Sequence, residues 1–205
     1  MAKTEIPPIA IDLDGGTDIG AAIVDADLLL IDDGAGGTMR KTAASRLKTY
    51  VGGGKILQVV QTVNNTEQST TSTSMQNSNA AVTITPSATS SKILLLGAIP
   101  CGSYKNSGSA STAAHIDMAL FRGDNTGTEL TYAENAFSYT ASSSGTTYSL
   151  SGSYAICYLD SPSTTSAQTY TVCYASLGSG WTAYMQWCLS GTDAESTLTA
   201  LEIGA

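Results

Sequence analysis

Charge is scarce in this sequence. Only 13% of its 205 residues are Asp, Glu, Lys or Arg, against about a quarter in an ordinary globular domain. Nine Lys and Arg are outnumbered by 17 Asp and Glu, which gives a net charge of −8. Binding to nucleic acid or to an anionic membrane needs clustered basic residues. The composition therefore argues against both classes of partner.

Long apolar runs and metal-ligand patterns are also missing. No stretch approaches the roughly 18 apolar residues of a membrane-spanning helix, and the N-terminus lacks the apolar block of a signal peptide. His115 is the only histidine, and Cys101, Cys157, Cys173 and Cys188 form no CxxC pair, so no zinc site is expected. We expect a soluble protein with free, mostly buried thiols, no metal and no cofactor.

Residues 1–26 form an acidic leader that is rich in Gly and Pro. Pro7-Pro8 and Gly15-Gly16 exclude a long helix, and isolated apolar residues between turn residues cannot build a core. Its DLDGGTD segment resembles a calcium loop, but it lacks the Gly and Glu register of an EF-hand, so we interpret it as a turn. We predict an extended docking arm whose contacts are Ile6, Ile9, Ile11 and Leu13.

Residues 27–54 change pattern twice. An apolar run at 28–31 stops at a cluster of Asp and Gly, and residues 38–42 alternate as a returning strand, which predicts a hairpin. Residues 43–51 are helix formers, and three glycines at 52–54 form a hinge. A helix this short is unstable alone in water. We therefore expect its face, formed by Ala43, Leu47, Tyr50 and Val51, to pack on the hairpin or on another chain. The predicted contacts to other chains are Leu47, Tyr50 and Val51.

Residues 55–205 repeat apolar and polar residues with a period of two, which is typical of β-strands. The continuous apolar run at 92–99 predicts a strand buried on both faces, and 115–122 with 128–132 predicts a hairpin. Turn residues recur at spacings typical of a sandwich. The fold class is thus mainly β, a hairpin-plus-helix module followed by a β-sandwich of jelly-roll type. The predicted strands are 56–63, 81–86, 92–99, 115–122, 128–132, 153–160, 169–175, 181–189 and 196–205.

Segments 153–160 and 169–175 are predicted to pair as antiparallel neighbours around the loop 161–168. In that register Cys157 faces Cys173, and both faces of the pair are apolar. One covering is the opposing sheet, and the other is a neighbouring subunit. A disulfide fits this register, but a reducing place of synthesis favours free thiols.

No catalytic constellation stands out. A Ser-His-Asp or Cys-His site would have to use His115, which starts a strand and is interpreted as a strand-end polar residue. Glu129 and Glu134 lie near one hairpin, but a glycosidase pair is defined by a distance that sequence does not give. We interpret them as solvated acids and predict a non-enzymatic protein.

Tyrosine is abundant, with ten residues against two Phe. Tyr together with Ser and Gly is the composition of adaptable recognition surfaces. Many of the tyrosines alternate inward and are assigned to the core. Tyr104, Tyr139 and Tyr148 lie beside loops rich in Ser and Gly, and we predict that they form an outward recognition surface.

These segments resemble a known family. VDADLLLIDDGAGGTMRKTAASRLKTYV resembles the hairpin-plus-helix module of tail-fibre and appendage proteins of tailed bacteriophages, especially marine ones. GKILQVVQTV, TITPSATSSKILLLGAI and LTALEIGA resemble the C-terminal β domain of phage virion proteins. The resemblance implies a homotrimer in the virion, assembled in the host cytoplasm, whose N-terminal arm docks on other virion proteins of the tail or capsid.

Three functions follow as hypotheses. The first is a fibre-type appendage that projects its β domain, with contact to a host surface or glycan. The second is a capsid decoration protein that stabilises the head. The third is a carbohydrate-binding module. The expected domains are a docking arm at 1–26, a hairpin-helix module with its hinge at 27–54, and a β-sandwich at 55–205.

Overall fold

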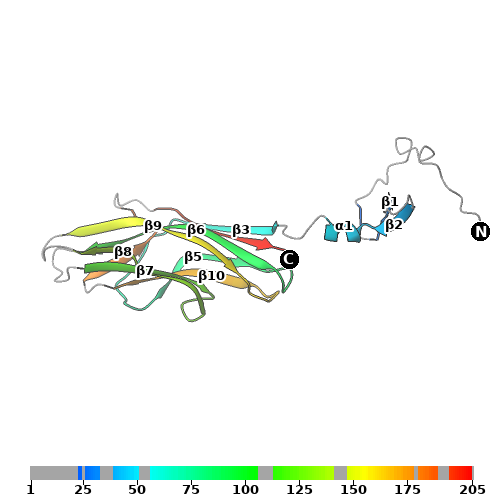
Figure 1. Ribbon diagram of the computed structural model, residues 1–205. Helices are drawn as coiled ribbons and strands as arrows, with labels where there is room; N and C mark the ends of the chain where they lie inside the picture. The colour runs from blue at the N-terminus through cyan, green and yellow to red at the C-terminus, as the bar shows by residue number, and fades with distance from the viewer. Residues whose placement is uncertain are drawn as a thin grey trace, which may run out of the picture. The chain divides into compact units, whose positions relative to one another are not determined.

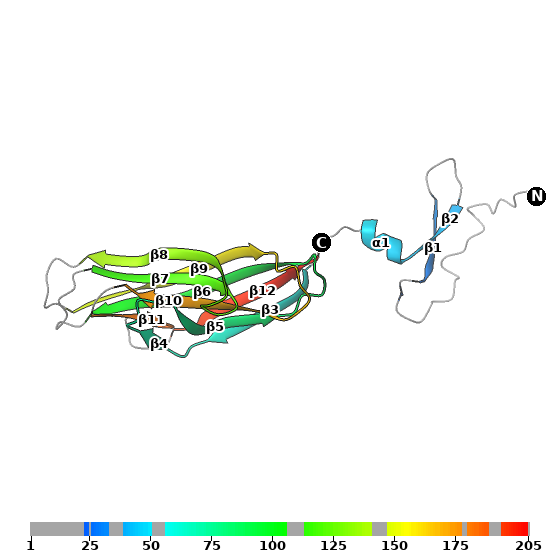
Figure 2. The same ribbon diagram turned by 90° about the horizontal axis from the view of Figure 1, so that it is seen from below.

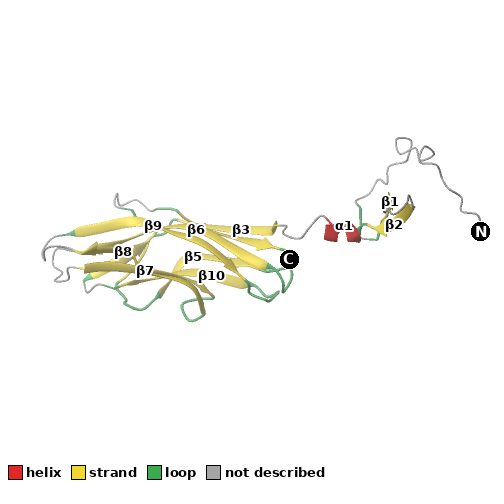
Figure 3. Cartoon of the chain, in the orientation of Figure 1, coloured by secondary structure: helices red, strands yellow, loops and turns green. Residues whose placement is uncertain are grey.

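The computed structural model describes residues 23–24, 26–32, 39–50, 56–105, 113–140, 147–177, 180–188 and 194–204 (Figure 3). Contacts divide the chain into two units, Met1–Gly53 and Gly54–Ala205. Each unit is described by itself.

The first unit contains a hairpin and a short helix. Strands β1 (Leu28–Asp32) and β2 (Met39–Ala43) pair antiparallel from Leu28 opposite Ala43 to Asp32 opposite Met39, as predicted. Helix α1 (Ser45–Tyr50) is shorter than expected. The amide of Ala44 donates to the carbonyl of Asp27 over 2.8 Å. Because this bond extends the hairpin, Ala43 belongs to β2 and does not share a helical face with Leu47.

The second unit is built from strands. They are β3 (Ile56–Asn64), β4 (Gln68–Thr70), β5 (Gln76–Ile84), β6 (Lys92–Lys105), β7 (Ala113–Arg122), β8 (Thr128–Thr140), β9 (Tyr148–Asp160), β10 (Gln168–Ser176), β11 (Trp181–Met185) and β12 (Ser196–Ile203).

These strands form two antiparallel sheets that pack as layers (Figures 1 and 2). One sheet has the order β5-β10-β7-β8. In the other, β6 pairs with β9 along one side and with β12 and then β11 along the other. Strand β3 lies beyond β12, and β4 lies beyond β11. This larger sheet is therefore four strands wide, with two of its positions occupied by strands placed end to end.

The path of the chain is that of a jelly roll. The chain crosses between the sheets at every connection except three: the β7–β8 hairpin and the links β3–β4 and β11–β12. Two Greek keys wound into a two-sheet sandwich have this order. The predicted β-sandwich of jelly-roll type is confirmed, as is the hairpin of residues 115–122 and 128–132.

The core lies between the two sheets and follows the two-residue period of the strands. In β12, Ser196, Leu198, Ala200 and Glu202 point inward and are buried, and the residues between them are partly exposed. The largest apolar side chains with almost no exposed surface are Trp181, Tyr170, Ile84, Ile93, Leu95, Ile99, Ile116, Met118, Leu120, Met185 and Leu198.

The predicted pairing of 153–160 with 169–175 is wrong. β9 pairs with β6, and β10 pairs with β5 and β7, so the two strands belong to different sheets. Cys157 lies opposite Leu96, whereas Cys173 lies opposite Ala119, and these two cysteines form no disulfide. The intervening loop crosses between the layers, so the inward tyrosines of both strands meet across the core.

The apolar run at 92–99 is also not buried on both faces. Ile93, Leu95 and Ile99 are buried between the sheets, but Leu96 is 40% exposed. The outer side of β6 is therefore apolar and is not covered by the described residues of the second unit.

Two buried carboxylates, those of Asp160 and Glu202, lie at one end of the sandwich. Asp160 on β9 accepts hydrogen bonds from Arg122 Nη1 (3.2 Å) and from the Tyr170 hydroxyl (2.8 Å), both on the opposite sheet. Burial, together with the Asp160 carboxylate, raises the pKa of Tyr170. Residues from two layers therefore share one charged group, which ties the sheets together.

Glu202 is the second of these carboxylates. Its Oε1 accepts hydrogen bonds from the amide and hydroxyl of Ser87, each over 2.6 Å, and Oε2 accepts one from Gln58 Nε2 over 2.7 Å. Burial raises the pKa of Glu202, but these hydrogen bonds outweigh it and lower the pKa from 4.5 to about 2. The fold thus favours the ionised form of this group.

We predict that Glu202→Gln removes an acid-sensitive part of the stability. A carboxyl group whose pKa is lowered on folding contributes stability above its unfolded pKa of 4.5, and this contribution is lost as the pH falls toward 2. At pH 7 the variant should lose about 1–3 kcal/mol, because buried donors lose a charged acceptor. Urea unfolding from pH 7 to pH 2 should show the gap to wild type shrinking below pH 5. Exposed Glu129→Gln is the control, and a gap that is constant with pH would contradict the prediction.

Candidate functional site

Five strand ends meet at one end of the sandwich, which we call the distal end. β6 ends there at Lys105 and β8 at Thr140, and β7, β9 and β11 begin there at Ala113, Tyr148 and Trp181. The distal end lies opposite the end at which β3 begins and β12 stops (Figures 1 and 2).

The structure brings the three predicted recognition tyrosines to strands at this end. Tyr104, on β6, is half-buried and lies opposite Ser149. Tyr148 begins β9, and the backbone of Tyr139 lies on β8 in the other sheet. A role in recognition remains a prediction.

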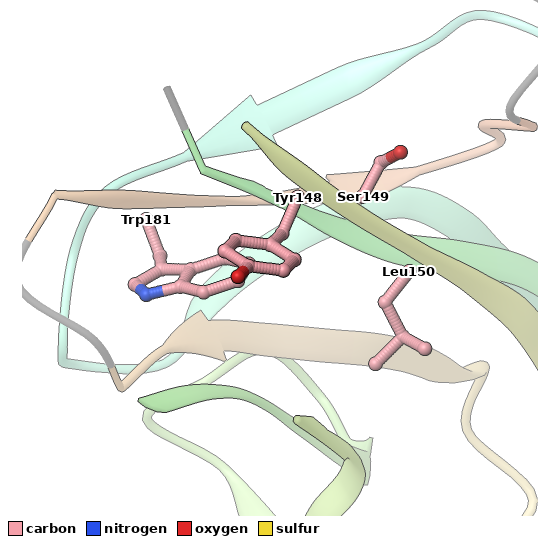
Figure 4. A pocket seen from close by; sticks show the side chains of 4 residues that line it. All are labelled: Tyr148, Ser149, Leu150 and Trp181. Carbon is pink, nitrogen blue, oxygen red and sulfur yellow. The ribbon is translucent and has the colours of Figure 1, made fainter. Parts of the chain in front are cut away.

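Trp181, Lys105 and Tyr148 form one row across the inner face of the distal end. The register places Lys105 opposite Trp181 on one side and opposite Tyr148 on the other. Lys105 Nζ lies 5.6 Å from the centre of the Tyr148 ring. Tyr148 and Trp181, with Ser149 and Leu150, line a pocket of about 210 Å³ (Figure 4).

Polar atoms in and beside this row lack partners. Lys105 Nζ, Trp181 Nε1 and Ser103 Oγ are buried and form no hydrogen bond with any residue that the structure describes. Ser103 lies one inward row further along β6, opposite Leu150 and Ala183. Buried polar groups are normally hydrogen-bonded, so these three are unusual. No sequence signal marked them beyond the alternation that turns Lys105 inward.

The outer side of the larger sheet presents a second feature, which we call the apolar outer face. The register aligns three rows across β3, β12, β6 and β9. The rows are Val59–Leu201–Leu94–Leu159, Gln61–Thr199–Leu96–Cys157 and Val63–Thr197–Ala98–Ala155.

These rows contain no charged side chain, and several members are well exposed. Val59 is 57% exposed, Val63 is 49% exposed and Leu159 is 47% exposed. Four strands at spacings of ~4.8 Å and five residues of ~3.3 Å along each strand give this face roughly 320 Å². The largest apolar patch on a monomer is typically about 300–600 Å² and often functional.

Trp187 limits the apolar outer face near the distal end and was predicted wrongly. Alternation along the predicted strand 181–189 would place Trp187 on the same inward face as Trp181. Instead Gln186 has a positive φ of 53°, which turns the chain. The Trp187 ring stacks on Tyr184 with centroids 5.0 Å apart, and it leaves no room for a Cβ at Gly102.

The predicted docking residues lie in or before the first unit. Leu47 is 40% exposed, and Tyr50 ends α1. Their contacts to another chain remain predictions. The other predicted docking residues, Ile6, Ile9, Ile11, Leu13 and Val51, lie outside the described residues.

The sequence candidates for chemistry are dispersed. His115 is half-buried on β7, and its Nδ1 has no hydrogen-bond partner among described residues. Glu129 and Glu134 are exposed on β8. The Tyr132 hydroxyl donates to Asp117, and this bond, with burial and nearby carboxylates, raises the Tyr132 pKa to about 12.

Two searches cover only the part of the chain that the structure describes. It holds no group of three His, Cys, Asp or Glu side chains suited to a metal ion. Nor does any of its helices have the length and apolarity to cross a membrane.

Comparison of the sequence with known protein families and with curated proteins gives no match. Among solved structures, the chain is similar to the infectious bursal disease virus particle, with 11% identity, a TM-score of 0.31, and coverage of 74% of this chain and 36% of that chain. It is also similar to the VP2 subviral particle of that virus, with 10% identity, a TM-score of 0.31, and coverage of 88% and 43%.

The chain thus spans less than half the length of these structures. Because the TM-scores are low, the jelly-roll assignment rests on the strand order of this chain. The functional proposals likewise rest on its own side chains.

We predict that Cys101 and Cys173 resist thiol reagents in the folded protein. Burial raises the pKa of each thiol to about 12. At Cys101 a backbone hydrogen bond opposes this shift, and at Cys173 the charge of Asp124 adds to it. The thiolate is the reactive form, so both should label only on unfolding. Mass spectrometry after maleimide labelling at pH 8, with and without urea, measures this. The same cysteines labelled in urea are the reference, and labelling of Cys101 in the folded protein at its rate in urea would contradict the prediction.

Proposed function

We propose that the chain is a non-enzymatic structural protein of a bacteriophage virion, a fibre-type appendage that works as a homotrimer. The apolar outer face is the observation that carries this proposal. A single chain leaves Val59, Leu96 and Leu159 in water. A partner that covers them gains about 25 cal/mol for each Å² of apolar surface buried.

Copies of the same chain are the partner that best fits this face. Fully buried interface cores and the interfaces of homo-oligomers are poor in charge and rich in apolar surface, and the three rows have that composition. This face is exposed to water as soon as the sandwich folds, so its partner should be present where the chain is synthesised. Identical chains meet this condition. In a closed ring of three, the face turns toward the axis, and its β3 and β9 sides contact different neighbours.

The first unit supplies the docking function in this proposal. Its short helix and the leader before it carry apolar residues that another virion protein can cover, including Leu47, which is 40% exposed. The sandwich then projects outward. The resemblance of residues 24–51 to phage appendage modules supports this division of labour.

Particles that lack the protein test the proposed role. A fibre-type appendage predicts that such particles keep intact heads under heat or low salt and lose adsorption to host cells. Fragile heads with normal adsorption would overturn the appendage role in favour of capsid decoration. Electron microscopy of gold-labelled particles gives the position independently.

We predict that Leu96→Asp prevents assembly of the trimer. Leu96 lies in the middle row of the apolar outer face, and burying an unpaired carboxylate there costs several kcal/mol. Light scattering at micromolar concentration should give three times 21.0 kDa for wild type and one chain mass for the variant.

Thr128→Asp is the matched control, because Thr128 is exposed on β8 of the other sheet. It should remain a trimer, and both variants should keep the wild-type circular dichroism. As a second readout, maleimide labelling of Cys157 should slow as the wild-type chain is concentrated. A wild-type mass of one chain, or a trimer of Leu96→Asp, would overturn this interface.

A further inference from the structure

The buried charged groups at the two ends of the sandwich differ in their partners. Asp160 and Glu202 each have two or more hydrogen-bond donors. At the distal end, Lys105, Trp181 and Ser103 bring donor atoms into the interior without an acceptor among the described residues. Leaving a buried donor unpaired destabilises the fold, and more so when the donor is charged. A binding site can retain such unpaired donors, because a bound ligand supplies the missing acceptor.

We propose that the distal pocket binds a small carboxylated sugar, whose carboxylate pairs with Lys105 and whose ring lies between Tyr148 and Trp181. This inference deepens the proposed function. It rests on that function only for the source of the ligand, an acidic glycan on a host surface. The need for an acceptor comes from the buried donors in and beside the pocket.

The chemistry of the three donors selects the ligand class. The Lys105 ammonium has three N–H donors and no acceptor, and the Trp181 indole has one donor. A carboxylate matches the ammonium, and sugar hydroxyls can accept from the indole and from Ser103. Because Lys105 stands between Tyr148 and Trp181 in the register, a carboxylate that enters between these rings comes next to it.

The size and lining of the pocket fit one sugar ring. A volume of about 210 Å³ is below the roughly 300–1,000 Å³ of pockets for drug-sized ligands. Its walls are two aromatic rings, with Leu150 and the polar Ser149 on β9 (Figure 4). Amphipathic rings of Tyr and Trp offer large contact area at a low entropic cost.

The test is a calorimetric titration of the full chain with methyl β-glucuronide and N-acetylneuraminic acid, against the neutral methyl β-glucoside. At least one acid should bind, and the glucoside should bind at least about tenfold more weakly, because a charge-assisted hydrogen bond is lost. Absence of binding by both acids, or equal binding of acid and glucoside, would overturn the proposal.

Variants locate the site. Lys105→Met should weaken acid binding at least about tenfold, and Ser103→Ala should weaken it several-fold. Lys92→Met is the matched control, because Lys92 is the exposed first residue of the same strand. Unchanged affinity in Lys105→Met, or an equal loss in Lys92→Met, would overturn the assignment.

The melting temperature without ligand distinguishes a loss of binding from a folding defect. Because Lys105 is buried and has no hydrogen-bond partner among the described residues, Lys105→Met should raise the melting temperature without ligand, and acid should raise the melting temperature of the wild type only. A lowered melting temperature would show that Lys105 already has a partner, which would remove the basis of the proposal. These measurements use no phage particle, so their outcome is separate from that of the adsorption and head-stability test.

Discussion

The continuity of strand β6 is the constraint on which the sandwich depends. Its 14 residues pair with β9 along one side, and with β12 and β11 in turn along the other. Leu94 and Leu96 contribute to the apolar outer face, whereas Ile93, Leu95 and Lys105 point inward. One strand therefore sets the register of the outer face and of the distal row together. A slip by one residue would exchange the two faces.

The two ends of the sandwich differ in their buried charged groups. At one end, Asp160 accepts hydrogen bonds from Arg122 and Tyr170 of the opposite sheet, and Glu202 accepts from Ser87. At the other end, an ammonium and an indole are buried without acceptors among the described residues. Satisfied buried networks fix a single structure, and unsatisfied groups cost stability. The proposed binding site lies at the distal end, where donors without described acceptors are buried.

Local patterns predicted local structure. The period of two gave the strands, and turn residues gave the hairpins β1–β2 and β7–β8. The pairing of β9 with β10 failed because neighbours in a jelly roll are often distant in sequence, and alternation does not identify the partner strand. Trp187 was misplaced because a non-glycine residue, Gln186, adopts a positive φ. Lys105 was missed because nothing in an alternating strand tells a buried lysine from an exposed one. The predicted docking contacts of the first unit remain untested.

The apolar character of both faces of β9 has a simpler origin than the pairing first inferred from it. Ile156 and Tyr158 point between the sheets, and Ala155, Cys157 and Leu159 point outward on the apolar outer face. An inner face buried by the fold explains half of the pattern, and the proposed assembly accounts for the other half. Because the proposed ligand pocket opens on the inner side of the same sheet, a partner on the outer side does not compete with the ligand. Assembly and recognition can therefore use one sheet without interfering with each other.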